Sequence, residues 1–324
     1  MAVGWNLEKD IPDLTGKVVL VTGGSAGLGF ATIQHLVRHG AKIYMTARSQ
    51  SRAEAAIARL KLGSVKGSVE WLVLDLSDPR EAKNAAERFL EREGRLDILI
   101  NNAATLAAPY EKTHDDIQDV MMINHISPFV WTETLLPLME KTAKEEGSDV
   151  RIINVASVTV SVLPDTIRFR NRENFNDEHR GWSAKLSELK RYSRSKLATI
   201  LFTKELQRRL DEQKIPIICV SVHPGTINTE GNQSVARRLG WCLGHVGSFL
   251  LNHLTTSSEQ GAYNHVFAAV APVVREQAEQ YKGAFLMPPG KITKKIIAPA
   301  EDMELAKELW ETTETLLKEI GVER

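Results

Sequence analysis

The sequence of 324 residues has little cysteine, no excess of charge of either sign and no long apolar run. Its two cysteines, Cys219 and Cys242, are too few for a disulfide framework, so we expect a reducing environment, the cytoplasm, with Cys219 buried in its apolar run. The 41 Lys+Arg residues balance the 41 Asp+Glu residues. This argues against a nucleic-acid partner, because phosphate contacts need a basic excess. No stretch of about 18 uncharged apolar residues is present, so the sequence predicts no integral membrane segment.

What the sequence does contain is a regular alternation of two patterns. Short apolar runs predict strands at 17–21, 42–46, 70–74, 97–100, 151–155, 217–222 and 284–287. Stretches with helical spacing predict a helix ending near 39 and others over 51–62, 79–92, 115–140, 192–212 and 301–320, with a bend at Pro128. We therefore expect an α/β fold: one domain over 1–324, built on a doubly wound parallel sheet with helices on both faces. Residues 226–324 are expected to add the last strand and helix and a lid over the substrate.

A glycine-rich turn follows the first predicted strand. Gly23, Gly27 and Gly29 lie where that strand becomes a helix. A turn without side chains lets the backbone N–H groups at the helix N-terminus approach a pyrophosphate. The alternative is an ordinary glycine turn, since the spacing Gly-x-x-x-Gly-x-Gly differs from the Gly-x-Gly-x-x-Gly of many dinucleotide enzymes.

The end of the second predicted strand discriminates between cofactors. An NAD enzyme places Asp or Glu there to bind the ribose 2′-hydroxyl. Here Ala47 and Arg48 occupy that position, and Arg52 follows one turn later. A guanidinium attracts a 2′-phosphate that a carboxylate would repel, so the sequence favours NADP(H), with Ser25 as a further phosphate contact. The alternative is that Arg48 only begins a solvated helix.

Tyr192 and Lys196 lie four residues apart in a predicted helix and hence on one face. A phenol is a weak acid at neutral pH, and an adjacent ammonium favours the phenolate, which suits the pair to acid–base catalysis. The alternative is a surface pair on an amphipathic helix.

Seven motifs occur in one order: residues 22–29, Asp75-Leu76, Asn101-Asn102-Ala103-Ala104, Asn124, Ser157, Tyr192 with Lys196, and Pro224-Gly225. With these motifs the chain resembles the short-chain dehydrogenase/reductase family from residue 14 to residue 317, which implies a Rossmann fold. Residues 47–48, 173–177, 192–202, 260–262 and 309–311 resemble its retinol-dehydrogenase and WW-domain-oxidoreductase-like branch. The 35 residues from Ser157 to Tyr192 are more than is usual in the wider family and are a feature of that branch.

The resemblance implies a role for each matching catalytic residue. Tyr192 is the acid/base, Lys196 lowers its pKa and holds the nicotinamide ribose, and Ser157 hydrogen-bonds the reacting oxygen. Asn124 fixes a water in a proton relay behind Lys196. An ordinary helix hydrogen bond would also account for Asn124, and Ala104 departs from the Gly that is usual in its motif.

The resemblance also implies a set of cofactor contacts. Asp75 contacts the adenine, unless it only stabilises a turn, and Asn102 lies beside the adenosine ribose. Thr229 contacts the cofactor near the carboxamide or the diphosphate. The whole set is Gly23, Ser25, Gly27, Leu28, Gly29, Arg48, Asp75, Leu76, Asn102, Ala103, Tyr192, Lys196, Pro224, Gly225 and Thr229.

The expected reaction is hydride transfer between NADP(H) and a lipophilic carbonyl or alcohol. Residues 158–190 and 230–254 are expected to build the substrate pocket, although the apolar part at 239–254 could equally be the core of a capping helix or lie on a membrane surface. Cys242 and His245 are too isolated to form a metal site. The alternatives are a non-catalytic NADP(H)-sensing or scaffold protein on the same fold, and an epimerase or dehydratase. The resemblance allows a homodimer or a homotetramer and selects neither.

Overall fold

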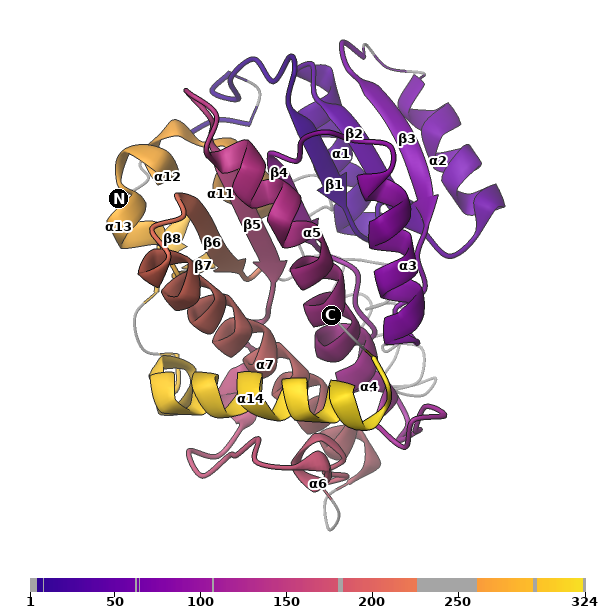
Figure 1. Cartoon of the computed structure of the whole chain (residues 1–324), viewed down its shortest axis with the longest axis vertical. Helices are drawn as coiled ribbons and strands as arrows, with labels where there is room; N and C mark the ends of the chain where they lie inside the picture. The colour runs from indigo at the N-terminus through magenta and orange to yellow at the C-terminus, as the bar shows by residue number, and fades with distance from the viewer. Residues whose placement is uncertain are drawn as a thin grey trace, which may run out of the picture.

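Eight strands form one sheet at the centre of the computed structural model (Figure 1). The structure describes residues 5–7, 9–61, 63, 65–106, 108–179, 183–225, 261–293 and 296–322. The strands are β1 Val18–Val21, β2 Lys42–Ala47, β3 Ser68–Val73, β4 Ile98–Asn101, β5 Val150–Val155, β6 Ile217–Val222, β7 Phe285–Met287 and β8 Lys291–Ile292. Their order is β3-β2-β1-β4-β5-β6-β7-β8, and all neighbours are parallel except β7 and β8. The expected doubly wound parallel sheet is confirmed. The chain order reverses between β1 and β4, the position at which open α/β sheets bind ligands.

Helices connect the strands and cover both faces of the sheet. They are α1 Gly27–Arg38, α2 Gln50–Lys61, α3 Pro79–Leu90, α4 Asp119–Met121, η1 Met122–Ile126, α5 Ser127–Ala143, η2 Val158–Val162, α6 Arg172–Phe175, α7 Ala184–Glu212, α11 Tyr263–Val270, α12 Pro272–Glu276, α13 Ala278–Tyr281, η3 Ala298–Glu301 and α14 Met303–Glu319. In Figure 1, α14 crosses α7 outside the sheet. Among the described residues, none of these helices combines the length and the apolar character that crossing a membrane requires.

Successive strand residues point to opposite faces and so build two separate cores. In β1, Val18 and Leu20 pack into a core with α3, α5, α7 and α14. Val19 and Val21 pack into the other core with α1, α2 and α11. Because both faces are covered, strands such as β5 and β6 are buried along their whole length.

Three elements differ from the sequence prediction. Strand β8 pairs antiparallel with β7 and was not predicted. Helix α7 begins at Ala184, where Ser183 caps it, eight residues before the predicted start. The predicted helix over 115–140 begins only at Asp119 and is interrupted by the π-helical η1 directly before Pro128. Pro128 has no N–H for the carbonyl four residues earlier, and the backbone slips so that Ser127 N–H donates to Met122 O, five residues back.

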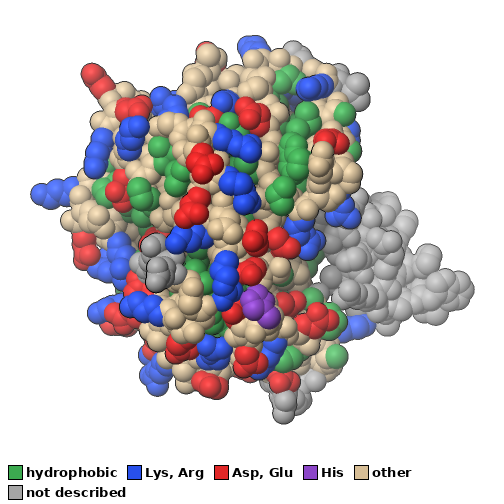
Figure 2. Space-filling model, turned by 45° about the vertical axis from the view of Figure 1, so that its right-hand side comes forward, with side chains coloured by type: hydrophobic (Ala, Val, Ile, Leu, Met, Phe, Trp, Pro, Cys, Tyr) green, Lys and Arg blue, Asp and Glu red, His purple; other side chains and the backbone are tan. Residues whose placement is uncertain are grey.

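The surface carries both signs of charge. Figure 2 shows Lys and Arg side chains intermixed with Asp and Glu over the visible face. Neither sign of charge forms a separate patch on this face, in keeping with the 41 basic and 41 acidic residues of the chain.

Candidate active site

The glycine turn between β1 and α1 has the backbone that its sequence implies. Gly23 has φ 67° and Gly27 has φ 56°, a region that side chains disfavour. A Cβ at Gly29 would overlap the carbonyl oxygen of Gly23. The sequence prediction missed Gly24, where a Cβ would lie 2.5 Å from Ile33 Cδ1. The turn thus depends on glycine both for its conformation and for its close packing.

Side chains from the end of β4 hold this turn in place. The Thr22 hydroxyl accepts hydrogen bonds from the backbone N–H groups of Asn102 and Ala103, each at 2.9 Å. Asn102 Nδ2 donates to Thr22 O at 2.8 Å. Asn102 was predicted as a ribose contact, but its amide group supports the turn, and Thr22 was not predicted to have a role. Its position directly after a strand and before the glycines was the available signal.

A cavity of about 660 Å³ opens beside the turn at the switch point of the sheet. Its lining includes seven of the predicted cofactor contacts together with Arg52 and Ser49; the seven are Gly23, Ser25, Arg48, Asp75, Leu76, Asn102 and Ala103. Asp75 Oδ1 also accepts the Ser77 N–H at 3.0 Å, so the turn role considered for Asp75 is present.

The start of α1 offers free backbone donors near this cavity. Ala26 at the N-cap has no side-chain cap, and the first turn has no acidic residue. The first N–H groups of a helix lack partners within it and attract anions. Two guanidinium groups, two serine hydroxyls and an uncapped helix N-terminus form a donor set that fits a phosphorylated dinucleotide.

The predicted catalytic side chains come together at the end of β5. Ser157 follows that strand directly, and its hydroxyl accepts the Thr159 N–H at 3.2 Å. Tyr192 and Lys196 lie one turn apart on α7, with Lys196 Nζ 5.7 Å from the centre of the Tyr192 ring. Lys196 Nζ donates to Val155 O at 2.7 Å, which fixes the ammonium to the last residue of β5, two residues before Ser157.

The protonation of this group differs from one expectation. Burial raises the pKa of Tyr192 to about 12, while the hydrogen bond with Ser157 lowers it in part. Burial lowers the pKa of Lys196 to about 8. Lys196, which was expected to lower the Tyr192 pKa, is not among the groups that shift it here. At neutral pH, Tyr192 is therefore a protonated phenol.

Asn124 occupies η1 and holds the adjacent loop. Its Oδ1 accepts the Thr105 N–H at 2.8 Å, and its Nδ2 donates to Thr105 O and to Ser195 Oγ, each at 2.9 Å. The side chain is therefore engaged with protein groups. A cavity of about 20 Å³, enough for one water, lies between Asn124, Lys196, Asn101 and Asn154. The buried Asn101 Oδ1 has no protein partner.

The end of β6 carries another predicted contact pair. Gly225, after Pro224, has φ 91°, and a Cβ there would lie 3.4 Å from Pro288 Cγ. Asn264, which the sequence prediction missed, donates to His223 O at 2.7 Å and accepts the Gly290 N–H at 2.8 Å. Leu28 is half-buried at the start of α1. Thr229, Cys242, His245 and the whole apolar window over 239–254 lie outside the described residues.

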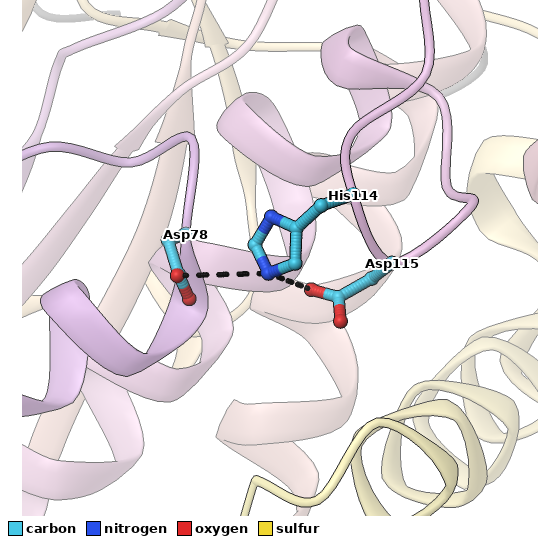
Figure 3. Close-up of side chains that lie close together, drawn as sticks. All are labelled: Asp78, His114 and Asp115. Carbon is cyan, nitrogen blue, oxygen red and sulfur yellow. Dashed lines mark ion pairs between the residues drawn. The ribbon is translucent and has the colours of Figure 1, made fainter.

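A cluster of acidic and histidine side chains lies apart from these groups. Figure 3 shows His114 Nε2 3.8 Å from Asp78 Oδ2 and 3.4 Å from Asp115 Oδ2. Arg80 pairs with both carboxylates, at 3.1 Å and 3.0 Å. The guanidinium offsets one of the two negative charges, and its ion pairs join the start of α3 to the turn at 114–115.

Comparison with known proteins places this geometry in a family. Residues 17–164 match the family model described as short chain dehydrogenase. A short-chain dehydrogenase/reductase of Armillaria gallica is 43% identical over 314 residues, covering 96% of each chain. The chain belongs to the short-chain dehydrogenase/reductase family. It is thus an oxidoreductase of the family, for which NAD(P)(H) is the typical cofactor.

A further relative and two solved structures also match the chain. A short chain dehydrogenase/reductase of Colletotrichum higginsianum is 41% identical over 97% of this chain and 78% of that one. An uncharacterised protein of Mycobacterium paratuberculosis has a structure with TM-score 0.71 and 28% identity over 98% of each chain. The RhlG/NADP complex of Pseudomonas aeruginosa has TM-score 0.63 and 25% identity, over 86% of this chain and 96% of that one. The two relatives named from the sequence comparison, those of Armillaria and Colletotrichum, are fungal, and the narrower retinol-dehydrogenase branch stays a prediction.

Proposed function

We propose that the protein is an NADP(H)-dependent oxidoreductase that transfers a hydride between the nicotinamide and a lipophilic carbonyl or alcohol, with Tyr192 as the acid/base. The observation that carries the proposal is the convergence of Ser157, Tyr192 and Lys196 at the end of β5, at the ligand-binding edge of the sheet. A phenol, a hydroxyl and an ammonium in one buried cluster can bind and protonate a carbonyl oxygen.

The proposed preference for NADP(H) over NAD(H) rests on the arginines that follow β2. Arg48 and Arg52 line the cavity of about 660 Å³ with Ser25, and the guanidinium groups suit a 2′-phosphate through forked, charge-assisted hydrogen bonds. Arg48 stands where an NAD enzyme would carry a carboxylate. The α1 N-terminus would hold the diphosphate, and the NADP bound by the RhlG neighbour agrees with this assignment. The bound nicotinamide would supply or accept the hydride.

The protein's own groups then carry the proton. In the reducing direction Tyr192 Oη–H gives its proton to the carbonyl oxygen, while the Ser157 hydroxyl donates a hydrogen bond to the same oxygen. Tyr192 is protonated at neutral pH, so the phenol begins this step in the required state. Reduction is the favoured direction where NADPH is in excess. Lys196 holds a positive charge near the phenolate that forms, and the small cavity behind it has room for a water that returns the proton.

The substrate class follows from the surroundings of Ser157. Helix η2 supplies Val158 and Val162, and Val162 is one of the few large apolar side chains exposed among the described residues. An apolar wall beside the reacting oxygen suits a lipophilic aldehyde or ketone. We place the rest of the pocket in residues 226–324 of the same single domain, and the protein in the cytoplasm, where NADPH is available.

A Tyr192→Phe variant tests the proposal. NADPH oxidation is measured with aldehydes and ketones of increasing chain length. Loss of the phenol proton is expected to lower turnover about 100- to 1000-fold while NADPH affinity is kept. Tyr281→Phe, at a buried tyrosine of α13, is the matched control and is expected to turn over like the wild type.

The same experiment separates the competing function. A non-catalytic NADP(H)-sensing or scaffold protein would bind NADPH and reduce no member of the panel. Equal turnover by wild type and Tyr192→Phe would remove Tyr192 from the chemistry.

A further inference from the structure

The long spacing between Ser157 and Tyr192 places an irregular chain segment beside the catalytic helix. Of the described residues 163–179, only Arg172–Phe175 form a helix, α6. Carbonyl groups of such a segment obtain few hydrogen bonds from regular structure, and when buried they need donors from elsewhere. The guanidinium group offers five donors in a fixed plane and is suited to this task.

Arg194, two residues after Tyr192, supplies donors to this segment. Its side chain is buried, with 5% of its surface exposed. Nη1 donates to Arg168 O at 3.1 Å and to Asn174 O at 2.6 Å, and Nη2 donates to Asp177 Oδ2 at 2.9 Å. One side chain therefore joins the segment at three points to α7.

Arg191, the residue directly before Tyr192, makes a second set of contacts. It is 4% exposed and donates to Glu178 O at 3.2 Å and to Ala108 O at 2.8 Å. Its guanidinium lies 5.7 Å from the centre of the Tyr110 ring. Arg191 thus binds the end of the segment and the separate loop that contains Ala108.

The far side of the segment is held by α14. Glu308 accepts the Phe169 N–H at 2.7 Å and pairs with Arg168 and Arg170. The segment therefore lies between arginine donors on α7 and a carboxylate acceptor on α14, and it has little freedom to move away from the catalytic turn.

The catalytic turn itself is held from within. Ser195 Oγ donates to Tyr192 O at 2.7 Å and accepts from Asn124. Tyr192 thus has a fixed residue on each side, Arg191 before it and Arg194 with Ser195 after it. A displacement of the segment would act directly on the turn that carries the phenol.

We infer that Arg191 and Arg194 are positioning residues that hold the 163–179 segment against α7 and thereby fix Tyr192 for proton transfer. The inference rests on the proposed role of Tyr192. Burying a guanidinium group is costly unless hydrogen bonds within the protein offset its desolvation. The two arginines donate to four backbone carbonyls of two chain segments. These hydrogen bonds offset the desolvation and hold both segments against α7. Lysine could not replace the arginines, since a single ammonium cannot reach carbonyls in several directions from one plane.

Hydrogen–deuterium exchange of the full chain tests the anchoring without any substrate. We compare wild type, Arg194→Met and Arg194→Lys with Arg208→Met, which removes an exposed arginine of the same helix roughly four turns further on. Exchange is expected to rise at least tenfold in peptides covering 163–179 and 189–196 in Arg194→Met, to rise less in Arg194→Lys and to stay unchanged in Arg208→Met. Unchanged exchange in both peptides of Arg194→Met overturns the inference.

Turnover then tests the consequence for Tyr192. In Arg194→Met, kcat for the best carbonyl of the panel is expected to fall about 100-fold, as misplacement of a reacting group by about 1 Å can cause. The NADPH dissociation constant is expected to stay unchanged. Raised exchange with a wild-type kcat contradicts the positioning role. If the wild type itself reduces no carbonyl, the proposed function fails, and the exchange of the 189–196 peptide still decides whether Arg194 fixes the turn.

Discussion

Two pairs of arginines near the catalytic edge of the sheet are used in opposite ways. Arg48 and Arg52 follow β2, are exposed and line the large cavity. Arg191 and Arg194 flank Tyr192 on α7 and are almost fully buried against backbone carbonyls. The residue type is the same, but the first pair has its N–H donors available at a cavity, whereas the second pair donates to groups within the protein.

The difference shows what burial does to a charged group. An exposed guanidinium keeps its water until an anion arrives, so it can bind a ligand at a small cost in desolvation. The two buried guanidinium groups together donate to four carbonyls and are part of the fold, so removing either one leaves two carbonyls unpaired. The first pair should therefore affect ligand affinity and the second the geometry of catalysis.

The largest effect on the cofactor side is expected at the turn beside the exposed pair. In Gly29→Ala the new Cβ would overlap Gly23 O and lie 2.7 Å from Asn102 Nδ2. Backbone must move, which we expect to lower NADPH affinity more than 100-fold and stability by about 1–3 kcal/mol. Calorimetric titration and thermal unfolding measure the two. Gly94→Ala is the control because a Cβ there meets nothing within 4 Å. Normal NADPH binding by Gly29→Ala would show that the turn does not contact the cofactor.

The next effect separates the two arginine pairs. Arg48→Ala is expected to weaken NADPH binding about 10- to 100-fold, the range of charge-assisted hydrogen bonds, and to leave NADH binding and the exchange of 163–179 unchanged. Arg194→Met should show the reverse pattern. Titration of both cofactors checks the prediction. Equal or tighter binding of NADH than NADPH by the wild type would contradict the NADP(H) assignment.

The comparison also shows which features a sequence can reveal. The glycine turn, Arg48 and the Tyr192–Lys196 pair were predictable because each depends on a few neighbouring residues and on one strand or helix end. The seven predicted strands are all present for the same reason. Their apolar runs are buried on both faces of the sheet.

The roles of Arg191 and Arg194 could not be predicted in this way. Arg191 bonds to Ala108, which lies 83 residues earlier, and Arg194 bonds to Asp177 across 17 residues of irregular chain. Strand β8 has two residues and exists only through its pairing with β7. Such contacts join segments whose relative positions depend on the whole fold.

The smallest expected effect is a loss of stability in acid, and it compares two buried histidines on opposite sides of the sheet. His125 bonds to Thr313 on the α7 side of the sheet, and His265 contacts Thr32 of α1 on the other side. Burial lowers the pKa of each from 6.5 to about 3. Between these values the unfolded chain binds a proton that the folded chain does not, so stability falls as pH falls below 6.5. At pH 5.5 each histidine should cost about 1.4 kcal/mol.

Urea unfolding between pH 7.5 and about 5 measures this cost as a slope. His125→Gln and His265→Gln should each flatten the dependence of the unfolding free energy on pH by the same amount, because desolvation of the charged ring is the largest cause of both pKa shifts. This holds whatever the stability of the two variants at pH 7.5. If only His125→Gln flattened the slope, water would reach His265 beside α1 in acid but would not reach His125 on the α7 side of the sheet. The two sides of the sheet would then differ in rigidity as well as in the use of their arginines.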